Sequence, residues 1–203
     1  MKVVEIFDSF QGEGIYTGEP ATFLRLAKCN LKCDFCDTKF NEFKEMGVEM
    51  VFEILKNHLK NHNNKLLVIT GGEPLLYYEE IKELVLMLSY QILNRGLKVQ
   101  IETNGLIKRI PIPNVTYVIS PKKDIDKVFE FYKDYDDAYF KFIITDEWDL
   151  QLIKGLQKKH YYNKTIWLQP EFSQTEKFIK LILSKKLNNI RISSQLHKYM
   201  GVE

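Results

Sequence analysis

Residues 66–74 read LLVITGGEP, a short apolar run followed by a glycine pair and a proline. A continuous apolar run of this length is typical of a strand that is covered on both faces, as in a parallel sheet. Gly71 and Gly72 allow the backbone to turn sharply and to approach a ligand closely, and proline is favoured at the first position of a helix. The stretch therefore predicts a buried parallel strand whose carboxyl end carries either a functional turn or a plain strand-to-helix connection.

Strand-like and helix-like segments alternate along the whole chain. Further strands are predicted at residues 21–28, 97–103, 115–120, 138–145, 165–169 and 189–193, besides 66–70. Helices are predicted around residues 49–61, 79–94, 124–134, 147–158 and 173–185. This alternation indicates βαβ units on a parallel sheet. Since six or so units are too few for an eight-stranded barrel, we expect one α/β domain over residues 1–203, with a partial (β/α)6-type barrel of parallel strands.

Composition excludes several classes of protein. With 45% hydrophobic and 28% charged residues and a net charge of +2, the chain is typical of a globular protein without a broad nucleic-acid surface. The first apolar stretch is interrupted by Glu5 and Asp8, and no run approaches the ~20 apolar residues of a membrane span. We therefore expect a cytoplasmic protein that contacts neither membrane nor nucleic acid, in a compartment where thiols stay reduced.

Polar landmarks follow the predicted strands at the point where each ends. They are Cys29, Thr70-Gly71-Gly72-Glu73, Glu102-Thr103-Asn104-Gly105, Ser120-Pro121-Lys122 and Gln169-Pro170. The carboxyl ends of parallel strands share one edge of the sheet, and this edge is where barrels and open α/β sheets bind their ligands. The sequence therefore predicts the active site at this edge.

All three cysteines of the chain, Cys29, Cys33 and Cys36, lie in one C-x3-C-x2-C stretch. Three thiolates suit an iron–sulfur cluster that leaves one iron open for a ligand. A zinc site is the alternative, and it would need a fourth ligand from a carboxylate or a histidine. The candidate histidines are His58, His62, His160 and His197.

The cysteine motif after the first predicted strand, together with Gly71-Gly72-Glu73-Pro74, resembles the radical S-adenosylmethionine (SAM) superfamily. This resemblance implies a radical SAM barrel with a [4Fe-4S] cluster on the three cysteines. It also implies that the open iron chelates SAM, which is cleaved on reduction to a 5′-deoxyadenosyl radical. Phe35 is expected to pack near the adenine, Gly72 to contact SAM, and Glu73 to accept from the SAM ammonium.

A narrower resemblance covers essentially the whole chain. The segments FQGEG at 10–14, YTGEPA at 16–21, CDT at 36–38, TGGEPLL, ETNG, SPK, LQP at 168–170 and the closing SSQLHKYMGVE are similar to those of 7-carboxy-7-deazaguanine synthases. That family converts 6-carboxy-5,6,7,8-tetrahydropterin to 7-carboxy-7-deazaguanine, a precursor of queuosine and archaeosine in tRNA, with loss of ammonia. The resemblance implies Mg2+, regeneration of SAM, a homodimer and a flavodoxin- or ferredoxin-like electron donor.

The same resemblance assigns roles to individual residues. The expected substrate contacts are Phe10, Gln11, Gly12, Arg25, Thr70 and the terminal Glu203, with Glu13 beside the pterin. The expected SAM contacts are Ser120, Pro121, Lys122, Gln169 and Pro170. Thr38 is the expected Mg2+ ligand, and Asp37 is an acceptor next to it. Glu203 adds a second negative charge to the terminal carboxylate that relatives direct at the substrate, which leaves that contact open.

Arg25 is also a candidate on its own chemistry. Alternation along residues 21–28 puts it on the same face as Phe23 and Ala27, in step with Cys29. A guanidinium among apolar neighbours needs a partner, and its planar fork suits a carboxylate. That partner is either the substrate carboxylate or an internal Glu13 or Glu102.

Two other functions are compatible with parts of the pattern. A glycyl-radical activating enzyme shares the cysteine spacing, but it acts on a protein partner and does not require FQGEG, Arg25 and Thr38 together. A non-catalytic zinc or cluster module would bind a partner without turnover.

Overall fold

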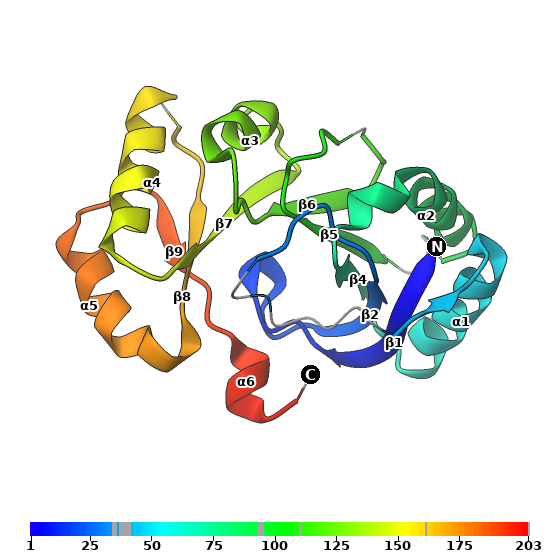
Figure 1. Cartoon of the computed structure of the whole chain (residues 1–203). Coiled ribbons are helices and arrows are strands. Elements are labelled where there is room, and N and C mark those ends of the chain that lie inside the picture. Colours follow the sequence, from blue (N-terminus) through cyan, green and yellow to red (C-terminus); the bar gives the residue numbers. More distant parts are fainter. Residues whose placement is uncertain (34–35, 37–41, 93–95, 110, 161, 203) are drawn as a thin grey trace.

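The computed structural model of the chain describes residues 1–202 except 34, 35, 37–41, 93–95, 110 and 161. Among these residues nine strands form one sheet in the order β3-β1-β2-β4-β5-β6-β7-β8-β9. The strands are β1 (Lys2–Phe10), β2 (Pro20–Leu26), β3 (Lys44–Glu45), β4 (Leu66–Gly71), β5 (Lys98–Thr103), β6 (Val115–Ile119), β7 (Ala138–Ile144), β8 (Ile166–Pro170) and β9 (Ile190–Ile192). From β2 to β9 all neighbouring strands are parallel. The sheet is open and curved, so the predicted partial barrel is confirmed (Figure 1).

The α-helices are α1 (Val48–Asn61), α2 (Tyr78–Ile92), α3 (Ile125–Tyr132), α4 (Glu147–Lys159), α5 (Thr175–Ser184) and the short α6 (Leu196–Met200). Helices α1 to α5 cover the outer face of this sheet, whereas α6 lies beside the opening of the barrel (Figure 1). The main apolar core lies between strands and helices and includes Leu24, Leu55, Ile69, Ile81 and Phe129. No helix of the described residues combines the length and apolar character needed to cross a membrane.

The inner face of the sheet divides into an apolar half and a polar half. Ala21, Phe23, Leu66 and Val68 form a small buried cluster near the start of β2 and β4. The residues that follow on the same strands, such as Arg25 and Thr70, line a cavity instead. Side-chain packing therefore closes one end of the barrel and leaves the carboxyl end of the strands open to ligands.

Strand β1 was not predicted, although it is the longest strand of the sheet. It pairs antiparallel with β2, with Phe7 opposite Phe23 and Asp8 opposite Thr22. Glu5 interrupts the apolar pattern on the face toward the cavity, and Asp8 interrupts it on the opposite face. Both faces of the strand thus carry a charge, so neither a continuous nor an alternating apolar pattern is left to indicate it.

The C-terminal segment returns to the segment that follows β1. The Leu196 amide donates to the Gly12 carbonyl oxygen at 2.9 Å, and the Gly14 amide donates to Ser193 Oγ at 2.8 Å. A Cβ on Gly12 would lie only 2.0 Å from Nδ1 of His197, so the absence of a side chain at residue 12 lets the imidazole pack there. Segments from the two ends of the chain therefore form one wall of the cavity.

Candidate active site

A cavity of about 940 Å3 opens at the carboxyl ends of the strands. This is at the upper end of the roughly 300–1,000 Å3 found for small-molecule sites. The predicted site residues that line it are Phe10, Gln11, Gly12, Glu13, Arg25, Cys29, Cys33, Cys36, Thr70, Gly72, Ser120, Lys122 and Gln169. Pro121, Pro170 and Glu73 do not line it. Phe35, Asp37, Thr38 and Glu203 lie outside the described residues, so their predicted roles stay predictions.

The three thiols lie at one end of the cavity. Cys29, Cys33 and Cys36 are not joined in disulfides, and all three line it. The Cys36 amide donates to the Cys33 carbonyl oxygen at 3.2 Å, and the Leu31 amide approaches Cys29 Sγ at 3.4 Å. Burial raises the pKa of the Cys29 thiol, which a bound metal centre would reverse because coordinating thiols are deprotonated. The donor set fits an iron–sulfur cluster with three protein ligands.

The glycine pair after β4 holds the residues that precede Cys29. The Gly72 amide donates to the Leu26 carbonyl oxygen at 2.8 Å, and the Glu73 amide donates to the Lys28 carbonyl oxygen at 2.9 Å. A Cβ on Gly72 would lie 2.0 Å from that Lys28 oxygen. Because the contact is with backbone, a side chain at Gly72 would push the start of the cysteine loop away from β4.

We expect Gly72→Ala to lower iron incorporation during cluster reconstitution, because the added methyl group displaces the backbone next to Cys29. The measurement is iron and sulfide per chain after identical anaerobic treatment. Gly155→Ala is the matched control, since a Cβ at Gly155 in α4 meets nothing within 4 Å. That control should bind iron like the parent and be more stable by about 0.5–1 kcal/mol. Equal iron contents in Gly72→Ala and the parent would refute this role.

Glu73 lies behind the cavity wall and is fully buried. Its carboxylate accepts from the Leu75 amide at 3.0 Å, Thr103 Oγ1 at 2.7 Å and the Asn104 amide at 2.8 Å. Burial raises the pKa of this carboxyl. In this structure Glu73 positions the turn after β4 against the end of β5, while its predicted contact with a SAM ammonium stays a prediction.

Ser120 and Lys122 form the wall that follows β6, and Lys122 Nζ donates to Ser120 Oγ. Burial, together with the nearby charge of Lys141, lowers the pKa of Lys122 to about 8. A nearby negative charge would stabilise the charged form of Lys122. This wall therefore suits an anionic group such as the SAM carboxylate.

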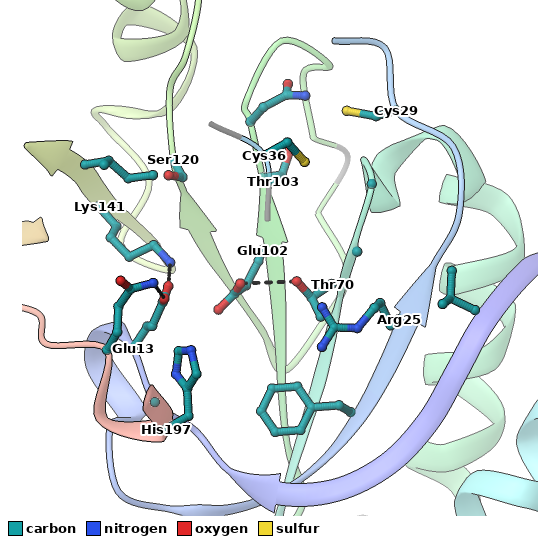
Figure 2. Close-up of a pocket in the computed structure, with 18 of the residues that line it drawn as sticks. Glu13, Arg25, Cys29, Cys36, Thr70, Glu102, Thr103, Ser120, Lys141 and His197 are labelled. Carbon is teal, nitrogen blue, oxygen red and sulfur yellow. Dashed lines mark hydrogen bonds and ion pairs between the residues drawn. The ribbon is translucent and has the colours of Figure 1, made fainter. Parts of the chain in front are cut away.

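Glu13 is the centre of a polar network at the other end of the cavity (Figure 2). Its carboxylate forms an ion pair with Lys141 of β7 and accepts from Gln169 Nε2 at 3.1 Å and Gln195 Nε2 at 3.0 Å. Burial opposes its ionisation, but the Lys141 ammonium outweighs burial and holds the pKa of Glu13 far below its usual 4.5. Glu13 is therefore a fixed anion and hydrogen-bond acceptor across the neutral pH range.

This low pKa predicts that Glu13 contributes to stability at neutral pH and that the contribution is lost in acid. A carboxyl with a depressed folded-state pKa stabilises the fold above its unfolded value of 4.5 and loses that effect as the pH falls below it. Urea unfolding of the parent and of Glu13→Gln should therefore differ most near neutral pH and converge in acid. A difference that does not depend on pH would contradict the assignment.

Glu102, near the end of β5, lies in the cavity between Glu13 and Thr70 (Figure 2). Its Oε1 accepts from Gln11 Nε2 at 3.2 Å and from Gln100 Nε2 at 3.0 Å, and its Oε2 accepts from Thr70 Oγ1 at 3.2 Å. From sequence, Glu102 was considered as part of the ETNG landmark and as one possible internal partner of Arg25. No role was predicted for Lys141 or Gln195, and His197 was considered as a candidate zinc ligand, although all three line the cavity.

Arg25 reaches the cavity from β2 and contacts β1. Its Nε lies 2.6 Å from Glu5 Oε1, although the N–H is not directed at that oxygen. Its guanidinium carbon lies 5.3 Å from the ring centre of Phe7, which stacks on Phe23. The internal acid next to Arg25 is thus Glu5 and not Glu13 or Glu102, which corrects the alternative considered from sequence.

The histidines considered as fourth zinc ligands are mostly engaged elsewhere. His58 and His62 contact Asp8, and His160 contacts Asp126 and Glu130. His197 lines the cavity next to Gly12 rather than at the cysteine end (Figure 2).

Comparison with known proteins agrees with this geometry. Residues 25–145 match the family model of the radical SAM superfamily. The whole chain aligns with the 7-carboxy-7-deazaguanine synthase of Rickettsia prowazekii at 34% identity, over 89% of that relative. The chain belongs to the 7-carboxy-7-deazaguanine synthase family. The synthase of Methanospirillum hungatei is 33% identical over the whole chain and 86% of its own length.

Solved structures share the fold of this chain. The crystal structure of QueE from Escherichia coli superposes with a TM-score of 0.70 at 25% identity, over 97% of this chain and 94% of that one. Streptococcus suis SuiB, at 12% identity and a TM-score of 0.57, shares the fold alone. Membership of this family implies a [4Fe-4S] cluster and SAM, and it gives no support to the zinc interpretation. That Cys29, Cys33 and Cys36 hold the cluster stays a prediction.

Proposed function

We propose that this chain converts 6-carboxy-5,6,7,8-tetrahydropterin to 7-carboxy-7-deazaguanine with loss of ammonia, as a radical SAM carbon–nitrogen lyase. The observation that carries the proposal is one cavity with three cysteine thiols at one end and an acidic network with Arg25 at the other. A single cavity of this kind supports two ligands in contact, a cofactor on the thiols and a heterocyclic carboxylate beside Arg25.

The cofactor end of the cavity is assigned from residues at the ends of four strands. Cys29, Cys33 and Cys36 would hold the cluster, while Gly72, Ser120 and Lys122 line the wall where SAM would lie. When bound, the cluster and SAM supply a 5′-deoxyadenosyl radical. Gln169 was predicted as a SAM contact, but in this structure it donates to Glu13, which supports a role between the two ligands. The curved sheet around the cavity would shield the reacting groups from water and stray hydrogen donors.

The substrate end of the cavity is assigned from the charge and the hydrogen-bonding capacity of its residues. Arg25 would bind the substrate carboxylate with its terminal N–H groups, since only its Nε lies against Glu5. Glu13, held as an anion by Lys141, and the Gln11 amide would read the aminopyrimidine edge of the pterin. Phe10, Gly12, Thr70 and Glu102 complete this part of the cavity, which would present C6 of the pterin toward the cofactor.

Further components of the proposal rest on family membership. We include Mg2+ with Thr38 as its ligand, a flavodoxin- or ferredoxin-like electron donor, a homodimer and a cytoplasmic location. Thr38 lies outside the described residues. The product is assigned to 7-deazapurine synthesis for tRNA, without a choice between queuosine and archaeosine. A glycyl-radical activating enzyme is not favoured, because the relatives named above are deazaguanine synthases.

The test is turnover by the anaerobically reconstituted full chain with SAM, a low-potential reductant, Mg2+ and 6-carboxytetrahydropterin. We expect a product with the ultraviolet spectrum and mass of 7-carboxy-7-deazaguanine, equimolar ammonia, and a lower rate when EDTA replaces Mg2+. Cleavage of SAM without any change in the pterin would overturn the substrate assignment and leave the radical SAM assignment standing. Absence of both reactions in iron-loaded protein would overturn the function as a whole.

A further inference from the structure

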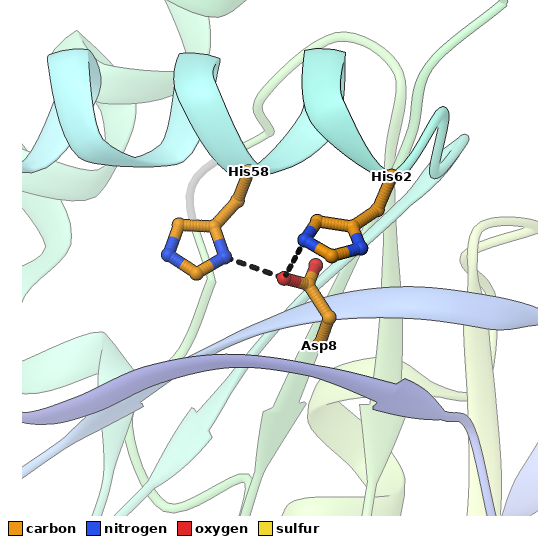
Figure 3. A group of neighbouring side chains, drawn as sticks. All are labelled: Asp8, His58 and His62. Carbon is orange, nitrogen blue, oxygen red and sulfur yellow. Dashed lines mark hydrogen bonds and ion pairs between the residues drawn. The ribbon is translucent and has the colours of Figure 1, made fainter.

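A second cluster of potential ligands lies away from the cavity. Asp8 of β1 contacts His58 of α1 and His62, the residue that caps the C-terminal end of α1, on the helix-covered side of the sheet (Figure 3). Asp8 pairs with Thr22 near the start of β2, whereas Cys29 follows the end of that strand. We infer that Asp8, His58 and His62 form a binding site for a late first-row divalent cation, Zn2+ foremost, which is separate from the cluster and from the proposed Mg2+.

The ligand atoms already converge. His58 Nδ1 lies 2.5 Å and His62 Nε2 lies 3.4 Å from the same oxygen, Asp8 Oδ2, and all three candidate atoms are within 4.8 Å of one another. The two histidines are four residues apart, and the amide of His62, the C-cap of α1, donates to the His58 carbonyl oxygen at 3.0 Å, so their side chains lie on one face at the end of the helix. Two imidazoles and one carboxylate are a donor set that suits Zn2+, and they leave a fourth position for water.

The carboxylate is held by a second layer of contacts. Asp8 Oδ1 accepts from Thr22 Oγ1 at 2.7 Å and from Asn64 Nδ2 at 2.8 Å, and Asn64 also donates to Thr22 at 3.1 Å. Thr22 is fully buried, so this layer is fixed by the sheet. The contacts turn Oδ2 toward both imidazoles, which is how metal-binding carboxylates are usually oriented.

His62 distinguishes a metal site from a plain ion pair. An ion pair that joins α1 to β1 needs only His58 and Asp8. The side chain of His62 is 58% exposed, and yet its Nε2 lies 3.4 Å from the oxygen that His58 already contacts (Figure 3). A cation would draw all three ligands together, connecting α1 to the strand that precedes Gln11 and Glu13.

The first experiment measures zinc in the cluster-loaded full chain, so that the cysteines are occupied. After incubation with Zn2+ and removal of free metal, the parent should hold one zinc ion per chain in addition to its iron. His62→Gln should lose it, with affinity lowered by at least about 100-fold, which is the upper range for loss of a mere supporting contact. Lys60→Gln, an exposed substitution on the same helix, should bind like the parent.

A supporting-residue variant and Co2+ spectroscopy test the same site independently. Asn64→Ala should weaken zinc by roughly 10- to 100-fold through loss of the supporting hydrogen bond. With Co2+ as the probe, a full chain carrying Cys29→Ser, Cys33→Ser and Cys36→Ser should show visible d–d bands without a thiolate charge-transfer band. Equal zinc affinity in His62→Gln and the parent would overturn the site. Turnover by His62→Gln should match the parent, so failure here does not bear on the proposed function.

Discussion

Replacing Cys33 with alanine is expected to lower formation of 7-carboxy-7-deazaguanine by at least about 10³-fold, because the protein alone supplies only binding and geometry for chemistry that the cofactor carries. With two thiols left in the cavity, the cluster would lose one of its three protein ligands. The measurement is product formed per chain, together with iron content and the absorbance of the reconstituted protein.

Lys32→Ala is the matched control for this loop, because Lys32 is exposed and does not line the cavity. It should bind iron and form product like the parent. Thermal unfolding before reconstitution should be similar for both variants, since Cys33 is only half-buried. Product formation by an iron-free Cys33→Ala protein would contradict the assignment of the cysteines.

Replacing Arg25 with methionine is expected to lower kcat/KM for the pterin by about 10- to 100-fold. Hydrogen bonds to a charged group contribute about 1.5–3 kcal/mol, and each 1.4 kcal/mol is about a factor of ten. Arg25→Lys should recover only part of the loss, because an ammonium keeps the charge without the planar fork. Steady-state kinetics with the pterin varied at saturating SAM gives the comparison.

Glu5→Gln separates substrate binding by Arg25 from its contact within the protein. Glu5 Oε1 lies 2.6 Å from Arg25 Nε. If that ion pair were the purpose of Arg25, both variants would lower stability and leave the KM for the pterin unchanged. We expect the opposite pattern, in which Arg25→Met raises KM strongly and Glu5→Gln does so weakly.

Much of the fold could be predicted because apolar runs and turn residues coincide with the elements. Residues 66–70 were predicted as a strand and form β4 (Leu66–Gly71), and residues 147–158 were predicted as a helix and form α4 (Glu147–Lys159). Strand β1 could not be predicted in the same way, since its charges at Glu5 and Asp8 interrupt both faces. Those charges depend on partners from β2 and α1 that are distant along the chain.

The site was predictable where a motif carries the chemistry and not where tertiary contacts create it. The C-x3-C-x2-C spacing and the glycine pair indicated the cofactor end directly. Lys141 has no motif, and its role follows only from an ion pair with Glu13, 128 residues earlier in the chain. Gln195 reaches Glu13 because the C-terminal segment docks on Gly12, a contact that no local pattern encodes.

The most direct test of the account uses pterin labelled with deuterium at C6 and unlabelled SAM. If the cavity holds the pterin at the Arg25 end with C6 toward the cofactor at the thiol end, the label should leave the substrate and enter the adenosyl group of the recovered SAM. Mass spectrometry of SAM and of 7-carboxy-7-deazaguanine from the same reaction would show both changes. Product that forms while the adenosyl group stays unlabelled would contradict the arrangement.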